Sequence, residues 1–334
     1  MKIELIPAHV PSFKANLHCH TNISDGHFSP EEVKRLYKEQ GYSIVAFTDH
    51  EIMIAHPELN DENFLALNGY EYEVISPASP ENPSHKLRKT CHMCLIALEP
   101  DNLTHVCWHG MLWGNAVNYR DQAVINEDEP LYKPVHSGEG ISHVMQAGRK
   151  NGFFVTYNHP CWSMEDMVDI QNYHGMHAME IWNTGCNMSG YPEYNPGIYD
   201  AVLRRGERIF CIAADDNHGA RDHFGGWVMI SADKLEYRTI TKALEDGRFY
   251  ATTGPEIKEL WYEDGQVHIR CSPAQRIRMG CGTRTSRIVN AEGSPVTEAV
   301  FPVEKDDIYF RINILAADGT HADTNAYFLD TLDK

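Results

Sequence analysis

The sequence predicts an α/β fold in which a βα barrel is followed by a small all-β extension. The barrel is predicted because short apolar segments alternate with helical stretches over the first three quarters of the chain. Such repeated βα units indicate a mainly parallel sheet, and their number favours a barrel over an open sheet. After Gly254-Pro255 the pattern changes to short strands separated by turn sequences such as Glu263-Asp264-Gly265. We therefore expect a barrel domain over residues 1–254 and a small β domain over residues 255–334.

The first βα unit is the most clearly marked. A strand is expected over residues 14–19, and Ser29 with Glu32 forms a Ser-x-x-Glu capping box in front of a helix, with Pro30 at its first position. Gly41 ends that helix, and the next strand covers residues 43–47. The later expected strands are 64–71, 91–98, 152–157, 178–182 and 209–213, and the later helices lie near 139–151, 194–205 and 236–247.

Residues 99–138 interrupt this alternation. The segment has little periodicity and is rich in ring-bearing and basic residues: Trp108, Trp113, Tyr119 and Tyr132 among His105, His109, Arg120 and His136. Long irregular segments within compact domains are often functional. We interpret the segment as a lid or pocket wall, with a surface excursion as the alternative.

Composition restricts the class of partner. With 42% hydrophobic and 23% charged residues, the 334-residue chain has the composition of a folded globular protein. Its formal charge of −18 argues against binding long nucleic acids, whose affinity depends on many cationic contacts, and leaves a small anionic substrate as the expected partner. No apolar run approaches the ~18 residues of a membrane span, so no membrane association is expected.

The N-terminus and the cysteines indicate a reducing compartment. Residues 1–7 lack the basic start and apolar core of a signal peptide, so a cytoplasmic location is expected. The nine cysteines are odd in number and several lie in apolar runs, which favours reduced thiols over a disulfide framework. Cys91 and Cys94 could suggest a metal or redox pair, but strand alternation would send their side chains to opposite faces.

Histidine is unusually frequent, with 19 copies against 16 tyrosines and 12 phenylalanines. Metal-binding residue types end several of the expected strands, and in a βα barrel these strand ends gather at one face. A divalent cation satisfies several buried histidines and carboxylates at once. The residues at these strand ends are His18, His20, His50, Glu71, His92, His159, Asp216 and His218.

These residues belong to a series of short motifs: His18-Cys19-His20, Ser24-Asp25-Gly26, Thr48-Asp49-His50, Gly69-Tyr70-Glu71, His92, Asn158-His159-Pro160 and Asp216-Asn217-His218. Over about residues 14–250 the series resembles that of the polymerase and histidinol phosphatase (PHP) family. The resemblance implies a distorted seven-stranded βα barrel with a trinuclear centre of zinc, manganese or iron. It further implies three ligand sets: His18, His20, Glu71 and Asp216; Glu71, His92 and His159, with Glu71 shared; and Asp25, His50 and His218.

Two of these assignments have alternatives. Glu73 lies on the same strand face as Glu71, although the Gly-x-Glu match favours Glu71. Asp215 precedes Asp216, but only Asp216 keeps the Asp-x-His spacing.

A weaker likeness, to the carbaryl-hydrolase-like branch, involves residues 243–250, Thr253-Gly254-Pro255 and Thr324-Asn325. Without that likeness, Gly247 simply ends a helix and Gly254-Pro255 marks a domain junction.

The sequence leads to one leading hypothesis and two alternatives. The leading hypothesis is a metal-dependent phosphoesterase in which a metal-bridging hydroxide attacks a small-molecule phosphate ester. The same cluster could instead hydrolyse a carboxylic ester, carbamate or amide, because a metal also polarises a carbonyl. The third hypothesis is a non-enzymatic metal-binding module.

Beyond Glu71 and Asp216, four residues are candidates for supporting roles. Glu180 could orient His159 or shuttle protons, with a structural role as the alternative. Arg221 and His223 could contact a phosphate, and His27 could assist near Asp25, although all three could simply be surface residues.

Overall fold

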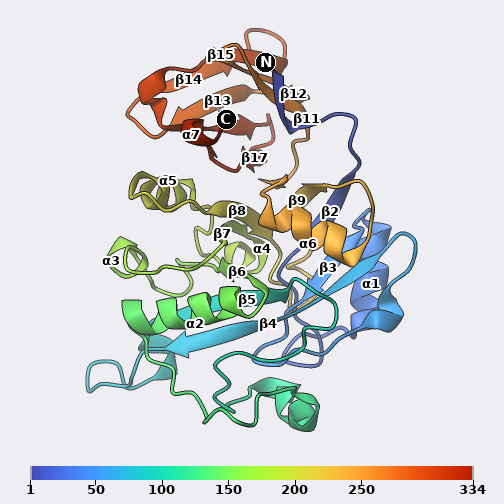
Figure 1. The fold of residues 1–334 in the computed structure, drawn as a ribbon, viewed down its shortest axis with the longest axis vertical. Helices are drawn as coiled ribbons and strands as arrows, with labels where there is room; N and C mark the ends of the chain where they lie inside the picture. Colours follow the sequence, from blue (N-terminus) through green and yellow to red (C-terminus); the bar gives the residue numbers. More distant parts are fainter. Residues whose placement is uncertain (1, 333–334) are drawn as a thin grey trace.

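The computed structural model describes residues 2–332, which form a mixed α/β structure with one large sheet and a separate four-stranded sheet (Figure 1). The helices are α1 (Pro30–Glu39), α2 (Gly138–Lys150), α3 (Met167–Ile170), α4 (Thr184–Met188), α5 (Pro196–Arg204), α6 (Tyr237–Glu245) and α7 (Leu329–Leu332). Short 3-10 helices are η1 (Pro57–Leu59), η2 (His85–Leu87), η3 (Gly114–Gln122) and η4 (Lys305–Asp307).

The strands fall into two groups along the chain. Those before residue 255 are β1 (Lys2–Ile6), β2 (Ser12–Asn16), β3 (Ile44–Phe47), β4 (Leu65–Ile75), β5 (Thr90–Ala97), β6 (Phe153–Tyr157), β7 (Ala178–Asn183), β8 (Phe210–Ala214), β9 (Trp227–Ser231) and β10 (Phe249–Thr252). Those after it are β11 (Ile257–Glu263), β12 (Gln266–Ala274), β13 (Arg276–Cys281), β14 (Ser286–Asn290), β15 (Val296–Pro302), β16 (Tyr309–Leu315), β17 (His321–Thr324) and β18 (Tyr327–Phe328). The strands and helices expected within residues 14–247 are all present, whereas β9 and β10 were not anticipated.

Local sequence signals explain the first helix. The Ser29 side chain accepts a hydrogen bond from the Glu32 amide, and the Glu32 side chain accepts one from the Ser29 amide, so the predicted capping box is confirmed. Gly41 follows the helix with φ of 76°, a backbone conformation that glycine adopts without strain. α1 buries Val33 and Tyr37 against β3 and fixes the loop that precedes it.

The expectation of a mainly parallel sheet is wrong for part of the molecule. From β9 to β8 the strand order is β9-β2-β3-β4-β5-β6-β7-β8. The pairs β2–β3, β3–β4, β6–β7 and β7–β8 are parallel, but β4–β5, β5–β6 and β2–β9 are antiparallel. The chain passes from β4 to β5 without an α-helix, and parallel pairing needs a long crossover that this loop does not supply.

The strand ladder of the described residues does not close into a barrel, and the expected count of seven strands is not confirmed. The chain segments that follow β2 and β8 nevertheless meet. The Asp216 amide donates to the His18 carbonyl at 3.0 Å, and the His20 amide donates to the Asn217 carbonyl at 3.2 Å. These bonds bring two motif segments, distant in sequence, to one end of the sheet.

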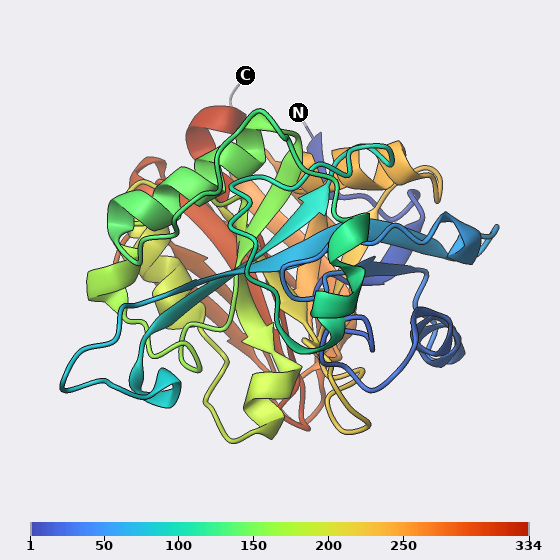
Figure 2. The ribbon, with the colours of Figure 1, turned by 90° about the horizontal axis from the view of Figure 1, so that it is seen from below.

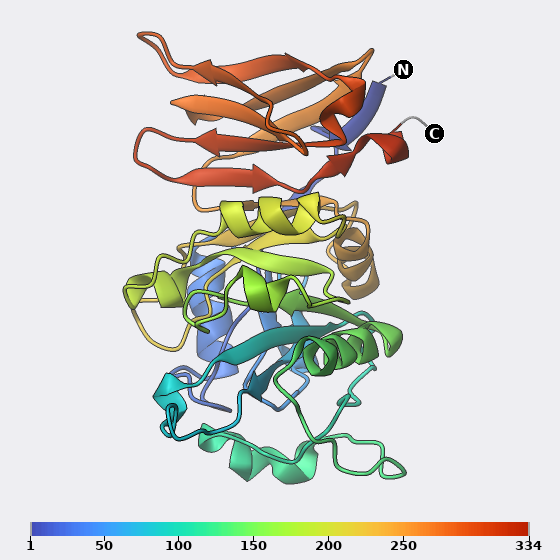
Figure 3. The ribbon, with the colours of Figure 1, turned by 90° about the vertical axis from the view of Figure 1, so that its left-hand side faces the viewer.

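The C-terminal strands form a second layered unit at one end of the molecule (Figures 1 and 3). The four-stranded sheet β1-β11-β12-β15 shares an apolar core, including Leu260, Ile269, Phe310 and Ile312, with the strands β13, β16 and β17 of the large sheet. β1 thus pairs with β11, although the two are far apart in sequence. The division of the chain at residue 254 remains a prediction.

The segment 99–138 lies at the end of the molecule opposite the C-terminal strands, and it crosses the face nearest the viewer in Figure 2. Its buried side chains pack as a small cluster that includes Leu112, Ala116 and Ile23. No helix in the described part of the chain combines the length and apolarity needed to cross a membrane. All nine cysteines are free, and Cys91 and Cys94 pack into different cores, as strand alternation predicted.

Candidate metal centre

The Glu71 carboxylate, on β4, lies at the centre of a ring of histidines. It is 1% exposed, and both of its oxygens face imidazole nitrogens. The contacts of Oε1 are His18 Nε2 at 3.1 Å, His92 Nδ1 at 3.2 Å and His159 Nε2 at 3.2 Å, and those of Oε2 are His50 Nδ1 at 3.2 Å and His20 Nε2 at 3.4 Å. One carboxylate therefore joins residues that follow β2, β3 and β6 to a histidine on β5.

The potential ligands fall into three overlapping groups, in each of which one donor atom per residue lies within 4.8 Å of the others. The groups are His18, His20, Glu71 and Asp216; His50, Glu71 and His92; and His20, Asp25, His50 and His218. The first is the set that the motif resemblance implied. The second group contains His50 in place of the expected His159, although His159 Nε2 also contacts Glu71. The third group contains His20 in addition to the expected residues.

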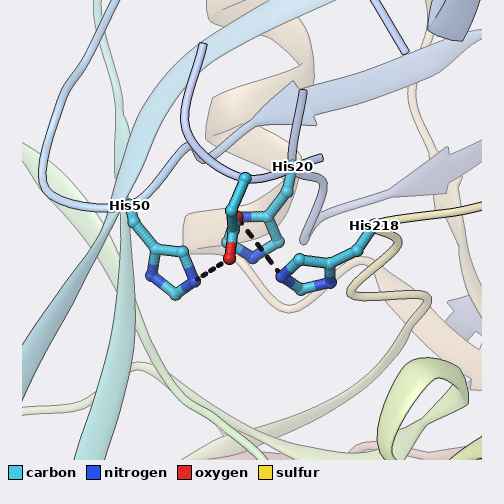
Figure 4. A group of neighbouring side chains, drawn as sticks. His20, His50 and His218 are labelled. Atoms are coloured by element: carbon cyan, nitrogen blue, oxygen red, sulfur yellow. Dashed lines mark ion pairs between the residues drawn. The ribbon is translucent and has the colours of Figure 1, made fainter. Parts of the chain in front are cut away.

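The third group is the most open of the three. Asp25 contacts His50 Nε2 at 3.6 Å, His218 Nε2 at 3.5 Å and His20 Nδ1 at 3.8 Å. Figure 4 shows His20, His50 and His218 converging from different segments on one point. The Asp25 side chain is 44% exposed and that of His218 is 35% exposed, so this group faces the exterior while the first group is buried.

One direct observation indicates that the donor set fits bound cations. Five buried atoms in this cluster have no hydrogen-bond partner in the structure: His20 Nδ1, Glu71 Oε2, His92 Nδ1, His92 Nε2 and Asp216 Oδ1. Leaving a buried polar atom unpaired costs about 1–3 kcal/mol, so five together are unfavourable unless a ligand satisfies them. Imidazole nitrogens and carboxylate oxygens are ligands of zinc and of other divalent transition metals.

Electrostatics keep the carboxylates of the cluster ionised. Burial raises the pKa of Glu71, but the surrounding His18 and His92 outweigh burial and hold that pKa well below its usual value. The pKa of Asp216 is likewise lowered, because His18 and His20 outweigh its burial. Burial lowers the pKa of His20, yet Asp216 and Glu71 together raise it to about 10. In the ion-free structure His20 is therefore protonated, and its positive charge is attracted to the two carboxylates.

Backbone strain accompanies the ligand positions. His159 has φ of 24° and Asp216 has φ of 52°, a region that non-glycine residues rarely adopt. Such strain persists only where the surrounding structure fixes it, and it is concentrated at functional sites. The amide of His159 donates to Glu180 Oε2 at 2.9 Å, and the amide of Asp216 donates to the His18 carbonyl, so both positions are held by hydrogen bonds.

The structure separates the two pairs of alternatives left by the sequence. Asp215 accepts hydrogen bonds from the amides of residues 224, 225 and 226 and from Tyr37 Oη, so its carboxylate is fully occupied. Asp216 instead faces the cluster, where its Oδ1 lies 3.0 Å from His20 Nε2 and makes no hydrogen bond. Glu73 lies beside the cluster, where it accepts from Thr90 Oγ1 and approaches His92 Nε2 at 3.4 Å. Asp216 and Glu71 are therefore the better placed of each pair.

Glu180 contacts a different histidine side chain from the one considered in the sequence analysis. Its Oε1 lies 2.7 Å from His18 Nδ1, while its Oε2 accepts only the backbone amide of His159. A carboxylate only accepts hydrogen bonds, so His18 carries its proton on Nδ1 and presents Nε2 to the cluster. Glu180 is fully buried and is not among the pocket-lining residues, so it acts through His18.

The remaining candidates lie outside the pocket. Arg221 is exposed and does not line it. The His223 side chain is 4% exposed and packs against Phe28 and Tyr37, so it is not the surface residue that was the alternative for it. His27 is exposed, and its backbone amide donates to the His218 carbonyl at 2.7 Å.

Three residues that support the cluster were not identified from the sequence. Asp49 accepts from the backbone amides and hydroxyls of Thr21 and Ser24, and so holds the loop that carries Asp25. Asn158 Nδ2 donates to Glu71 Oε1, and Asn183 Nδ2 donates to both Asp216 Oδ2 and Glu180 Oε2. Asp49 and Asn158 stand inside the quoted motifs, so their proximity to the ligands was a signal. For Asn183, in the strand segment that carries Glu180, only the fold reveals the contact.

A cavity of about 450 Å³ opens over the cluster. Its lining includes six members of the ligand groups, namely Asp25, His50, Glu71, His92, Asp216 and His218, and also their neighbour His159. The rest of the lining is Glu73, His85, Trp113, Trp162, Gly185, Cys186, Ser189 and Asp222. Trp113 belongs to the segment 99–138, so this segment contributes to the pocket wall, one of the two roles considered for it.

A pocket floored by overlapping histidine and carboxylate groups defines a candidate polynuclear metal centre. No family model matches the sequence, and no curated protein matches it.

Among solved structures, the chain resembles a two-domain protein from Bacteroides vulgatus that contains a predicted PHP-like metal-dependent phosphoesterase. The TM-score is 0.44 and the identity 13%, and the match covers 97% of each chain. It also resembles a lesion-specific endonuclease from Pyrococcus furiosus, with a TM-score of 0.42, 12% identity, and coverage of 71% of this chain and 56% of the other.

PHP-like phosphoesterases are thus among the structural neighbours, and neither protein is described as a carbaryl hydrolase.

Proposed function

We propose that the chain is a metal-dependent phosphoesterase of the PHP type that hydrolyses a phosphate ester of a small molecule. The observation that carries this proposal is the set of five buried ligand atoms that make no hydrogen bond, at and around Glu71 on the floor of a pocket. Cations held there would satisfy these atoms. A small substrate is proposed because a cavity of about 450 Å³ matches the size of ordinary small-molecule sites.

The residues divide the binding of cations among them. One ion would be held by His18, His20, Glu71 and Asp216. A second would be held by Glu71 and His92, together with His50 or His159. A third would be held by Asp25, His50 and His218, with His20 in reach. When bound, divalent ions of this kind polarise the phosphoryl oxygens and lower the pKa of water. Zinc, manganese and iron are all compatible with imidazole and carboxylate ligands.

Charge supports an anionic substrate. Three divalent ions would bring six positive charges, and Asp25, Glu71 and Asp216 would remove three of them. The remaining charge of about +3, in a chain of formal charge −18, would focus the potential on the pocket and attract an anion there. In the hydrolysis, water oxygen bonds to phosphorus, the bond from phosphorus to the ester oxygen breaks, and the released alcohol takes a proton.

The chain's own residues orient the ligands. Glu180 fixes the tautomer of His18, Asn158 and Asn183 donate to the ligand carboxylates, and Asp49 holds the loop before Asp25. Asp222 accepts the amides of residues 218 and 219 and so fixes the backbone that carries His218. Such contacts around the ligands keep the reacting groups in place.

The test compares two electrophiles in one assay. Purified protein supplied with manganese or zinc is given p-nitrophenyl phosphate, bis-p-nitrophenyl phosphate and p-nitrophenyl acetate, with Glu71→Gln as the inactive control. We expect turnover of a phosphate that chelation abolishes and metal restores. Turnover of the acetate alone would replace this proposal with that of a carboxylic ester, carbamate or amide hydrolase. Bound metal without turnover of any substrate would indicate a metal-binding module.

A further inference from the structure

The part of the pocket that lies beyond the ligands carries two indole rings. Trp162 follows β6, and its ring meets those of His92 and His159 edge to face at centroid distances of 5.2 and 5.0 Å. Its backbone amide donates to the buried carboxylate of Glu193 at 3.1 Å. Because rings and backbone are both fixed, Trp162 forms a rigid apolar wall directly beside the metal ligands.

The second indole, Trp113, is brought to the pocket by the segment 99–138. The next residue, Gly114, has φ of 52°, and a Cβ added there would lie 2.6 Å from the Ser24 carbonyl. The Asn115 amide donates to the same carbonyl at 2.7 Å, and Asn115 Nδ2 donates to the Asn22 carbonyl at 3.1 Å. The segment is therefore docked on the loop that carries Asp25.

This docking leaves the Trp113 side chain at the cavity with 43% of its surface exposed. A large aromatic surface that faces a pocket, rather than a core, is suited to stacking on a planar ligand.

Among the described residues that line the cavity, the acidic side chains of the outer pocket are matched by no lysine or arginine, and the one further basic group is the His85 imidazole, 3.7 Å from Glu73. Apart from the proposed metal-binding carboxylates, the lining contains Glu73 and Asp222. Proteins commonly hold additional phosphate or carboxylate groups with arginine or lysine. A second anionic group on the substrate would here meet two carboxylates and no permanent side-chain cation.

Resting on the function proposed above, we infer that this site takes phosphate monoesters whose organic part is planar and aromatic and has no second anionic group. Bound metal ions would hold the phosphoryl group, Trp113 and Trp162 provide apolar surface for the ring, and Glu73 with Asp222 disfavours a further negative charge. Diphosphates and sugar bisphosphates are thereby disfavoured, whereas aryl phosphates are admitted.

The test uses phosphonates, because they bind without reacting and so remove differences in leaving-group chemistry. Dissociation constants are measured by calorimetry on manganese-loaded protein for methylphosphonate, 2-naphthylmethylphosphonate and benzylphosphonate. They are also measured for a bisphosphonate, namely benzylphosphonate with a second methylphosphonate group in the para position. We expect the naphthyl compound to bind about tenfold or more tightly than methylphosphonate, which is the order of one aromatic stacking contact. The bisphosphonate is expected to bind no more tightly than benzylphosphonate.

Variants of Trp113 test whether its indole ring causes the preference for the naphthyl compound. Trp113→Ala is expected to remove most of the naphthyl preference while methylphosphonate binding is unchanged, and Trp113→Phe is expected to keep part of it. Met111→Ala is the matched control, because Met111 is 47% exposed in the same segment and does not line the pocket. That variant should bind every phosphonate as the wild type does.

The outcomes separate the two proposals. If no phosphonate binds to the metal-loaded protein, the proposed phosphoesterase function fails. If methylphosphonate binds as tightly as the naphthyl compound, or if the bisphosphonate binds more tightly than benzylphosphonate, the function stands and the substrate class is overturned. An undiminished naphthyl preference in both Trp113 variants would also overturn the role of this residue.

Discussion

His18 Nδ1 lies 2.7 Å from Glu180 Oε1, and both side chains are fully buried. This pair resembles the arrangement in which a carboxylate orients a metal-binding histidine. Loss of such a partner commonly reduces metal affinity or activity by 10–100-fold, to order of magnitude. For Glu180→Gln we expect a fall of about this size in metal affinity at the His18 group, measured by competition with a chelating dye.

A matched variant distinguishes positioning from general stability. Glu165 is also a buried carboxylate, and it pairs with Tyr157, Tyr173 and His136 instead of a proposed ligand. Glu165→Gln is expected to lower stability without changing metal affinity. Equal metal affinity in the wild type and in Glu180→Gln would contradict the positioning role of Glu180.

Glu71 contacts five histidines, so its replacement should affect more than one ion. We expect Glu71→Gln to lose more bound metal than any single histidine variant, and to lose activity by more than the ~100-fold upper range of an orienting residue. Metal content is measured by elemental analysis after dialysis. Glu73→Gln is the control two residues along the same strand, and it should retain its metal. Full metal content in Glu71→Gln would refute the shared-ligand assignment.

Removal of metal should destabilise the protein, because the cluster then contains five buried atoms that make no hydrogen bond. A ligand present at a thousand times its dissociation constant stabilises the folded state by about 4 kcal/mol. We expect chelation to lower the melting temperature by several degrees, and manganese or zinc to restore it, as measured by differential scanning fluorimetry. A melting temperature that responds to neither treatment would argue against bound metal.

His105 gives stability a pH dependence that is independent of the metal centre. Its Nδ1 lies 2.9 Å from the Val124 carbonyl, and its Nε2 accepts from the Met53 amide at 2.9 Å, so the neutral ring joins the segment 99–138 to the loop after β3. Burial, assisted by His109, lowers the pKa of His105 to about 4. The unfolded chain, with a pKa near 6.5, therefore binds this proton more readily than the folded chain.

The stabilising contribution is present above pH ~6.5 and is lost as the pH falls toward 4. Over this range the unfolding free energy of the wild type should fall by up to about 3 kcal/mol more than that of His105→Gln. The measurement is urea unfolding of chelator-treated wild type and variant between pH 7 and pH 4. Parallel pH profiles for the two proteins would contradict the assignment.

Arg311 carries a buried charge between the C-terminal strands and α5. Its Nη1 donates to Asp323 at 2.8 Å and its Nε to Asp200 at 2.6 Å, and the side chain is 1% exposed. Removing one member of a buried pair leaves the other charge uncompensated, and this costs about 3–5 kcal/mol. We expect Arg311→Met to lower the unfolding free energy by this amount in chemical denaturation.

An exposed ion pair provides the comparison. Arg208 bonds Asp330 through both terminal nitrogens, but its side chain is 51% exposed. Exposed pairs contribute about 0–1 kcal/mol, so Arg208→Met should have a small effect. Similar losses in the two variants would contradict the importance of burial.

The sequence alone determined the local features of this protein. Ser29 and Glu32 predicted the start of α1, and apolar patterning located strands β2 to β8 but not β9 and β10, because capping and side-chain alternation depend on near neighbours. The motifs also singled out the ligand candidates, since metal-binding residue types after several strands are improbable by chance. Spacing alone favoured Asp216 over Asp215, and Asp216 is the residue whose carboxylate lies among the potential ligands.

Only the tertiary structure decided which side chains meet. In the structure β4 pairs with β5 in the antiparallel sense, and Glu180 contacts the ring of His18 and not that of His159. His20 lies beside Asp25, and Trp113 lines the pocket. Local patterns do not encode these contacts because they join segments far apart in the chain. At His159 and Asp216, moreover, the strained backbone directs the side chain, and strand alternation no longer applies.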